Sequence, residues 1–106
     1  MSDERRIHPR RKTHLAATLE RGTDAVEGVV ENVGVGGVFF APELLDLAAS
    51  EGDAVLVTLH VAPERRVRRS GSVLRADRYF DGSRVVRAFA IRFDERLDPG
   101  EAGLED

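Results

Sequence analysis

Short stretches in which apolar and polar residues alternate follow one another along most of the chain. Leu15, Ala17 and Leu19 alternate with less apolar neighbours, and the turn residues of 21–24 separate this run from a second one. A period of two is typical of strands with one buried face, and a short Gly/Asp connection favours a hairpin. The pattern predicts six strands, over residues 13–20, 25–32, 38–41, 54–61, 65–76 and 85–93.

The connections between these segments are short and rich in turn residues. Glycines fill 34–37, Asp81 and Gly82 separate the last two strands, and Asp98-Pro99-Gly100 follows the final one. Pro42 suits the first position of a helix, so one helical turn is predicted over 42–47. Six short strands at roughly ten-residue spacing predict an all-β fold, a six-stranded antiparallel barrel whose closure removes exposed edges.

Length and charge divide the chain into three predicted parts. A chain of 106 residues is the size of one domain, and its net charge is −3. Residues 1–14 hold five cations and two acids, giving +3, which leaves −6 for the rest. We therefore predict a flexible basic arm over 1–12, a barrel over 13–94 and an acidic tail over 95–106. A basic arm on an acidic body suits a small polyanion better than DNA or RNA, which favour a broad basic face.

Several functional classes lack support in the sequence. No apolar run is long enough to cross a bilayer and no secretory signal opens the chain, so we expect a cytoplasmic protein without membrane insertion. There are no cysteines, and His8, His14 and His60 lack metal-ligand spacing, so no metal or cofactor is expected. His60, within an apolar strand, is predicted to be structural. Ser70 and Ser72 lack a nucleophile-elbow pattern, and we expect no enzyme.

Two segments carry the candidate chemistry. The first is Arg6-Ile7-His8-Pro9-Arg10, in which Pro9 disfavours a helix and two guanidinium groups stand four residues apart. Each planar fork can bond two phosphate oxygens or the O6 and N7 edge of guanine. The second is Asn32-Val33-Gly34-Val35-Gly36-Gly37. There Asn32 can cap its own turn or offer its amide to a purine, and Gly37 permits close backbone approach or a positive φ.

These two segments resemble the signatures of the PilZ domain, a bacterial receptor module for cyclic di-GMP: Arg-x-x-x-Arg, then Asp/Asn-x-Ser-x-x-Gly. The resemblance covers Arg5 to Phe93 and implies a six-stranded barrel that relays nucleotide binding to a partner protein. It implies that the nucleotide is bound by Arg6, Arg10, Asn32, Gly34 and Gly37, with Arg5 and Arg11 as secondary candidates.

One position departs from this family, because Gly34 stands where its members have Ser. Losing one hydrogen bond to a charged group costs about 1.5–3 kcal/mol, or about 10- to 150-fold in affinity. Two readings therefore remain open: a cyclic di-GMP receptor, and an adaptor of the same fold that binds no nucleotide and acts through protein contacts, for example in motility regulation. A small nucleic-acid binder is a third, weaker reading. The arginines of 65–75 are either a solvated face or an extension of a phosphate site.

Overall fold

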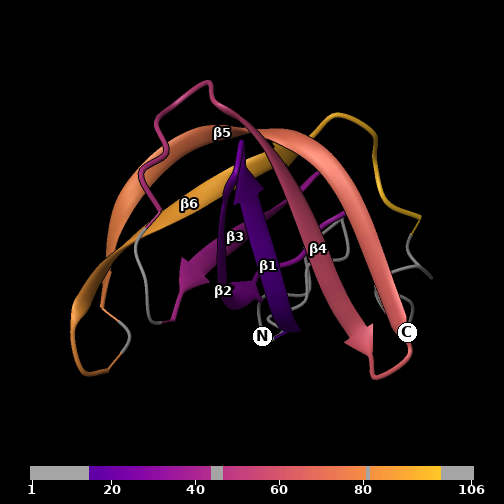
Figure 1. Cartoon of the computed structure of the whole chain (residues 1–106), viewed down its shortest axis with the longest axis horizontal. Helices are drawn as coiled ribbons and strands as arrows, with labels where there is room; N and C mark the ends of the chain where they lie inside the picture. The colour runs from indigo at the N-terminus through magenta and orange to yellow at the C-terminus, as the bar shows by residue number, and fades with distance from the viewer. Residues whose placement is uncertain (1–14, 44–46, 81, 99–106) are drawn as a thin grey trace, which may run out of the picture.

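The structure, a computed structural model, describes residues 15–43, 47–80 and 82–98, which form one closed antiparallel barrel (Figure 1). Its strands are β1 (Leu15–Arg21), β2 (Asp24–Glu31), β3 (Gly37–Pro42), β4 (Ala54–Ala62), β5 (Arg65–Phe80) and β6 (Val85–Phe93). The predicted all-β fold and its six strands are confirmed. The predicted arm and most of the predicted tail lie outside the described residues.

Closure results from the pairing of β1 with two neighbours. The strand order around the barrel is β1-β2-β3-β6-β5-β4, and β1 pairs with both β2 and β4. The inward residues fill the interior, and Leu19, Phe40, Val57 and Phe89 are all 0% exposed. A small barrel filled by branched and aromatic side chains needs no ligand for its core, so the fold leaves its functional groups to the surface and loops.

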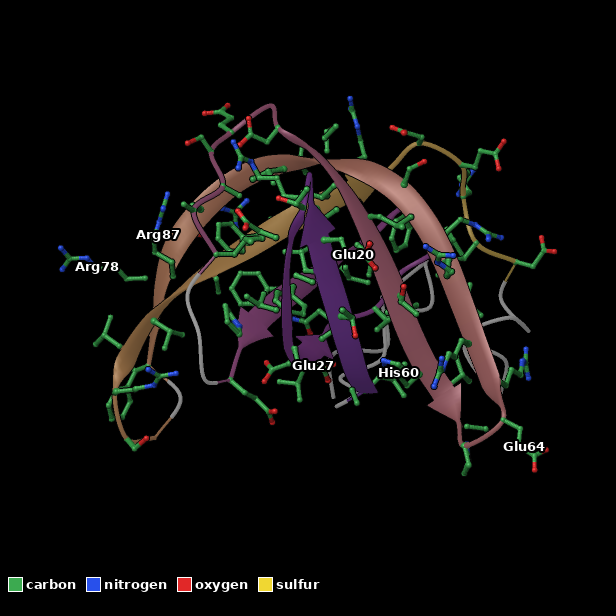
Figure 2. All side chains as sticks on the ribbon, in the orientation of Figure 1. Glu20, Glu27, His60, Glu64, Arg78 and Arg87 are labelled. Atoms are coloured by element: carbon green, nitrogen blue, oxygen red, sulfur yellow. The ribbon has the colours of Figure 1, made fainter. Side chains whose placement is uncertain are left out.

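The longest strand extends beyond the barrel. β5 reaches Phe80 rather than the predicted residue 76, and its pairing with β4 ends at Ser72 while its pairing with β6 continues to Phe80 and Val85. The result is a two-stranded ribbon, from which Arg78 projects in Figure 2. Phe80 and Val85 at its end are 65% and 61% exposed.

The helical turn predicted from Pro42 is wrong at its start. Pro42 is the last residue of β3, where it lies opposite Gly28 of β2, and it is buried. Proline is tolerated at strand ends as well as at helix starts, so its type alone did not distinguish the two. Residues 44–46 lie outside the described residues. The part of the chain that the structure describes has no helix long and apolar enough to span a membrane.

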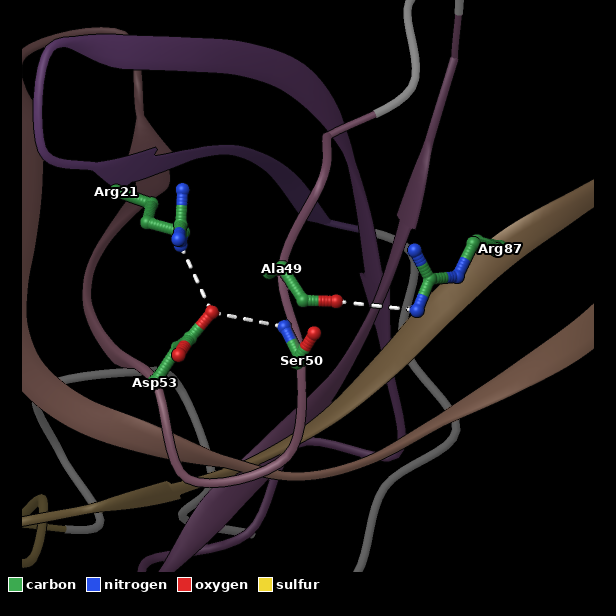
Figure 3. Close-up of polar contacts among 5 residues, drawn as sticks. All are labelled: Arg21, Ala49, Ser50, Asp53 and Arg87. Carbon is green, nitrogen blue, oxygen red and sulfur yellow. Dashed lines mark hydrogen bonds and ion pairs between the residues drawn. The ribbon is translucent and has the colours of Figure 1, made fainter.

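The loop from residue 47 to residue 53 is fastened to the barrel by two arginines (Figure 3). The Arg21 Nε and the Ser50 amide both donate to Oδ2 of Asp53, each at 2.8 Å. The Ser50 amide and then the Arg21 guanidinium hold the pKa of the Asp53 carboxyl below its ordinary value. The hydrogen bonds to the ionised Asp53 carboxylate therefore stabilise the folded state at neutral pH, and this stabilisation is lost as the pH falls through the pKa of Asp53. Arg87 of β6 donates to the Ala49 carbonyl at 3.1 Å.

Candidate functional site

Asn32 follows β2 in a left-handed backbone conformation, with φ at 55°. It was predicted as the last strand residue, but this φ ends β2 at Glu31. Asparagine tolerates positive φ better than most residues do. Its side chain is exposed, and no hydrogen bond of its amide is found among residues 15–43, 47–80 and 82–98. The side-chain amide of Asn32 was predicted either to cap the turn or to contact a purine. In the structure it does not cap the turn.

The turn after Asn32 is closed by its own backbone. The Gly34 amide donates to the Gly37 carbonyl at 2.9 Å, and Val33 is 0% exposed and packs in the core. Gly34 has no positive φ, and among the described residues a Cβ added there would meet only the Gly37 carbonyl oxygen, at 3.9 Å. The backbone and the space at position 34 therefore accept a serine. Glycine there is not required by the fold.

Gly37, in contrast, is required by the packing of two strands. It lies opposite Arg92 in the pairing of β3 with β6, and a Cβ on Gly37 would stand 2.2 Å from the carbonyl oxygen of Ile91. Its φ is not positive. Of the two reasons predicted for this glycine, close backbone approach is the one that applies.

The turn is also docked on the chain segment that follows β6. The Phe93 amide donates to the Gly36 carbonyl and the Leu97 amide donates to the Val35 carbonyl, each at 2.8 Å. Leu97 is only 3% exposed and packs against the core. The turn is therefore a supported platform on the barrel rather than a free loop.

The predicted arginines Arg5, Arg6, Arg10 and Arg11 lie outside the described residues, but the point where their segment joins the barrel is defined. The first residue of β1, Leu15, lies opposite Val30 near the end of β2. The described chain therefore begins, at Leu15, beside the strand that leads into the turn.

The end of the barrel where β1 begins, called the turn end below, also gathers cations from β5. Ala17 of β1 lies opposite Leu59, and the next residue of β4, His60, lies opposite Arg66 of β5. The first residues of β5 thus lie at the same end of the barrel as the first residues of β1, with β4 between them. Arg75 lies further along β5 and forms an ion pair with Asp77 at 2.7 Å.

His60 is half-buried and shares a 3.2 Å hydrogen bond with the Thr18 hydroxyl, as expected of a structural histidine.

One cation beside the turn was missed at the sequence level. Arg92 lies on the outer face of β6 directly opposite Gly37, and its side chain is exposed. Residues paired in this way have their Cα atoms about 4.5–5.5 Å apart. Alternation within β6 shows that Arg92 points outward, but only the register between β3 and β6 shows that it flanks the turn.

The fold is shared with two solved structures. The PilZ domain of YcgR from Escherichia coli, solved with cyclic di-GMP, superposes with a TM-score of 0.69 at 13% identity, over 93% of this chain and 84% of that one. The Bacillus subtilis inhibitor of motility MotI/DgrA gives 0.68 at 16% identity, over 94% of this chain but only 47% of its own length. No protein-family model and no curated protein sequence matches the chain.

These likenesses define the fold. The closed six-stranded barrel, with its turn between β2 and β3, has the fold of the PilZ domain. The fold expected from the two sequence signatures is confirmed. The roles of the individual residues are taken up next.

Proposed function

We propose that this chain is a cytoplasmic signalling module that binds cyclic di-GMP and passes the event to a partner protein. The observation that carries the proposal is the turn end, where an exposed amide, Asn32, stands on a supported turn beside the attachment point of an arginine arm. A neighbour of the same fold is solved with cyclic di-GMP. The chain thus acts by binding rather than by catalysis.

In this proposal the arm supplies charge and the turn supplies orientation. Arg6 and Arg10 donate in pairs to phosphate oxygens or to the O6 and N7 edge of guanine. An extended chain spans at most about 3.6 Å per residue, so Arg10 lies within about 18 Å of Leu15 and can reach a ligand on the turn. Asn32 offers both a donor and an acceptor to a purine edge. Arg5 and Arg11 add charge beside them.

The Gly34 backbone does not replace the missing serine hydroxyl. Its amide is already used by the Gly37 carbonyl inside the turn. A phosphate that approached this amide would have to break that bond. The absent hydroxyl is therefore a net loss at the site, and we expect an affinity below that of a chain with serine at this position.

Replacing Arg6 or Arg10 by alanine is expected to weaken cyclic di-GMP binding by about 1.5–3 kcal/mol each, because each change removes charge-assisted hydrogen bonds. The melting temperature should stay nearly constant, since solvent-exposed charges contribute little to stability. Isothermal titration calorimetry with parallel thermal melts measures both quantities. Unchanged affinity in both variants would remove the arm from the site, and a large loss of melting temperature would make these arginines structural.

Asn32→Gly is expected to weaken binding about tenfold or more without loss of stability. Glycine keeps the left-handed backbone at φ 55° and removes only the amide. Asn32→Ala is the informative companion, because alanine removes the same amide but is strained at positive φ. Calorimetry should therefore show equal losses of affinity, and thermal melts should show a loss for alanine alone. Full affinity in Asn32→Gly would leave the residue with a purely conformational role.

The second candidate function is an adaptor that binds no nucleotide. Two observations favour it: Gly34 lacks the hydroxyl, and the ribbon beyond the barrel exposes Phe80 and Val85. MotI/DgrA, a neighbour of the same fold, is an inhibitor of motility. Calorimetry of the unmodified chain with cyclic di-GMP separates the two functions, because the adaptor gives no heat of binding at any concentration tested.

A further inference from the structure

A pocket forms beside the end of β6, where the first residues of β5 have no β6 residue opposite them. Pairing of β5 with β6 reaches only Gly71, opposite Phe93, whereas β4 continues beside β5 to its first residue. The segment after β6 crosses the uncovered edge, and the Asp94 amide donates to the Ser70 carbonyl at 2.9 Å. These elements border an open surface pocket of about 330 Å³, lined by Leu56, Arg68, Arg69, Ser70 and Glu95.

The pocket is separate from the platform described above. The turn is hydrogen-bonded to Phe93 and Leu97, whereas the pocket is lined by residues of β4 and β5 and by Glu95. Neither Asn32 nor Gly34 lines the pocket. Its volume lies near the lower end of the 300–1,000 Å³ typical of small-ligand sites.

The walls combine an apolar surface with charges of both signs. Arg68 is exposed and lies on the outward face of β5, the face that also holds Ser70, which lies opposite the half-buried Leu56. Glu95 comes from the segment after β6 and is exposed. No ion pair of Glu95 is found among the described residues. The pocket therefore presents a guanidinium fork, a carboxylate and an aliphatic wall together.

A simple anion would not use this combination, because the Glu95 carboxylate repels it. A guanine base uses all three groups. Its O6 and N7 accept from an arginine fork, its N1–H and N2–H₂ donate to a carboxylate, and its flat face packs on an aliphatic side chain. Adenine carries a donor, N6–H₂, where guanine has the O6 acceptor, and so opposes the arginine.

We propose that this pocket is a guanine subsite for a nucleotide. Arg68 donates to O6 and N7, Glu95 accepts from N1–H and N2–H₂, and Leu56 packs on the base. The Ser70 hydroxyl supplies a donor for a ribose or phosphate oxygen. The subsite rests on the chemistry of the pocket and does not require that cyclic di-GMP bind at the turn.

The test uses the full chain, labelled with ¹⁵N, and follows its amide resonances during titration with GMP, AMP and inorganic phosphate. GMP is expected to shift the amide resonances of Ser70 and Glu95 along saturable binding curves. AMP is expected to bind more weakly than GMP by a factor of about ten or more. Arg68→Gln should weaken GMP binding about tenfold. The matched control is Arg66→Gln, which makes the same charge change two residues away on the same face of β5 and outside the pocket.

Glu95→Gln decides between the base and its phosphate as the group held. If the base is read, removing the carboxylate weakens GMP binding. If the arginines hold only the phosphate, removing a neighbouring negative charge tightens GMP binding, and that result overturns the proposal. Equal shifts with phosphate alone, or none with GMP at millimolar concentration, also overturn it.

A further variant keeps this test apart from the proposed function. Asn32→Gly is expected to leave the GMP shifts of Ser70 and Glu95 unchanged while weakening cyclic di-GMP binding at the turn. Loss of the pocket shifts in Asn32→Gly would mean that the two sites are one, contrary to the proposal. A chain that binds GMP in the pocket but never binds cyclic di-GMP would retain the subsite and lose the proposed function.

Discussion

Gly37→Ala is expected to destabilise the barrel by about 2–4 kcal/mol and to lower the melting temperature by about 10 °C or more. The added Cβ would stand 2.2 Å from the Ile91 carbonyl oxygen, and this neighbour is backbone, so no side chain can rotate away. Relief requires β3 and β6 to separate, which breaks the ladder from Gly37 to Phe40. Because domains are stable by only about 5–15 kcal/mol, the loss is a large fraction of the whole.

Gly36→Ala is the matched control for this variant. It lies one residue earlier, has no positive φ, and a Cβ there meets nothing within 4 Å. The same methyl group should leave stability unchanged or raise it by about 0.4–1 kcal/mol through the unfolded state. Urea unfolding followed by circular dichroism gives both values. Similar stability in the two variants would show that the β3–β6 approach is looser than described.

Gly34→Ser is expected to tighten cyclic di-GMP binding about tenfold or more, because it restores a hydroxyl beside the ligand. Position 34 has ordinary backbone geometry and open space around its Cβ. The variant should therefore fold with unchanged or slightly raised stability, and the change in affinity is not masked by strain. Gly36→Ser is its control, since it places the same hydroxyl two residues further along the turn.

Three results of this comparison separate the candidate functions. Measurable binding in the unmodified chain that improves with Gly34→Ser identifies a receptor with a weakened site. Binding that is absent at first and gained with serine identifies an adaptor whose site lost the nucleotide. No binding in either chain, with the barrel intact by circular dichroism, contradicts the nucleotide proposal and leaves protein contacts as the function.

The strands of the barrel could be predicted because one face of each is buried. Val55, Val57 and Leu59 of β4 alternate toward the core, and so do Phe89, Ile91 and Phe93 of β6. The end of β5 could not be predicted in this way. Beyond residue 76 β5 pairs with β6 alone, and although Val86 and Ala88 of β6 are buried there, Arg78 and Phe80 of β5 are exposed. The end of β5 therefore carries no period-two signal of its own.

Some residues of the candidate site could be predicted from local sequence patterns, and others could not. The two signatures are local, and they identified Asn32 and Gly37. The approach of Arg92 to the turn, and of Glu95 to Arg68, depends on the register of strands far apart in the chain, which no local pattern contains. Alternation could have marked Arg92 as outward, but its neighbour across the ladder becomes known only from the fold.

Two backbone hydrogen bonds hold the turn against the segment after β6, so the motion of the turn can be measured at residues of that segment. The Phe93 amide is held by the Gly36 carbonyl and the Leu97 amide by the Val35 carbonyl. Both amide hydrogens are protected from exchange with solvent only while they are hydrogen-bonded to the turn. Their exchange rates therefore measure how often the turn lifts from the barrel. A ligand that holds the turn down slows them without touching either residue.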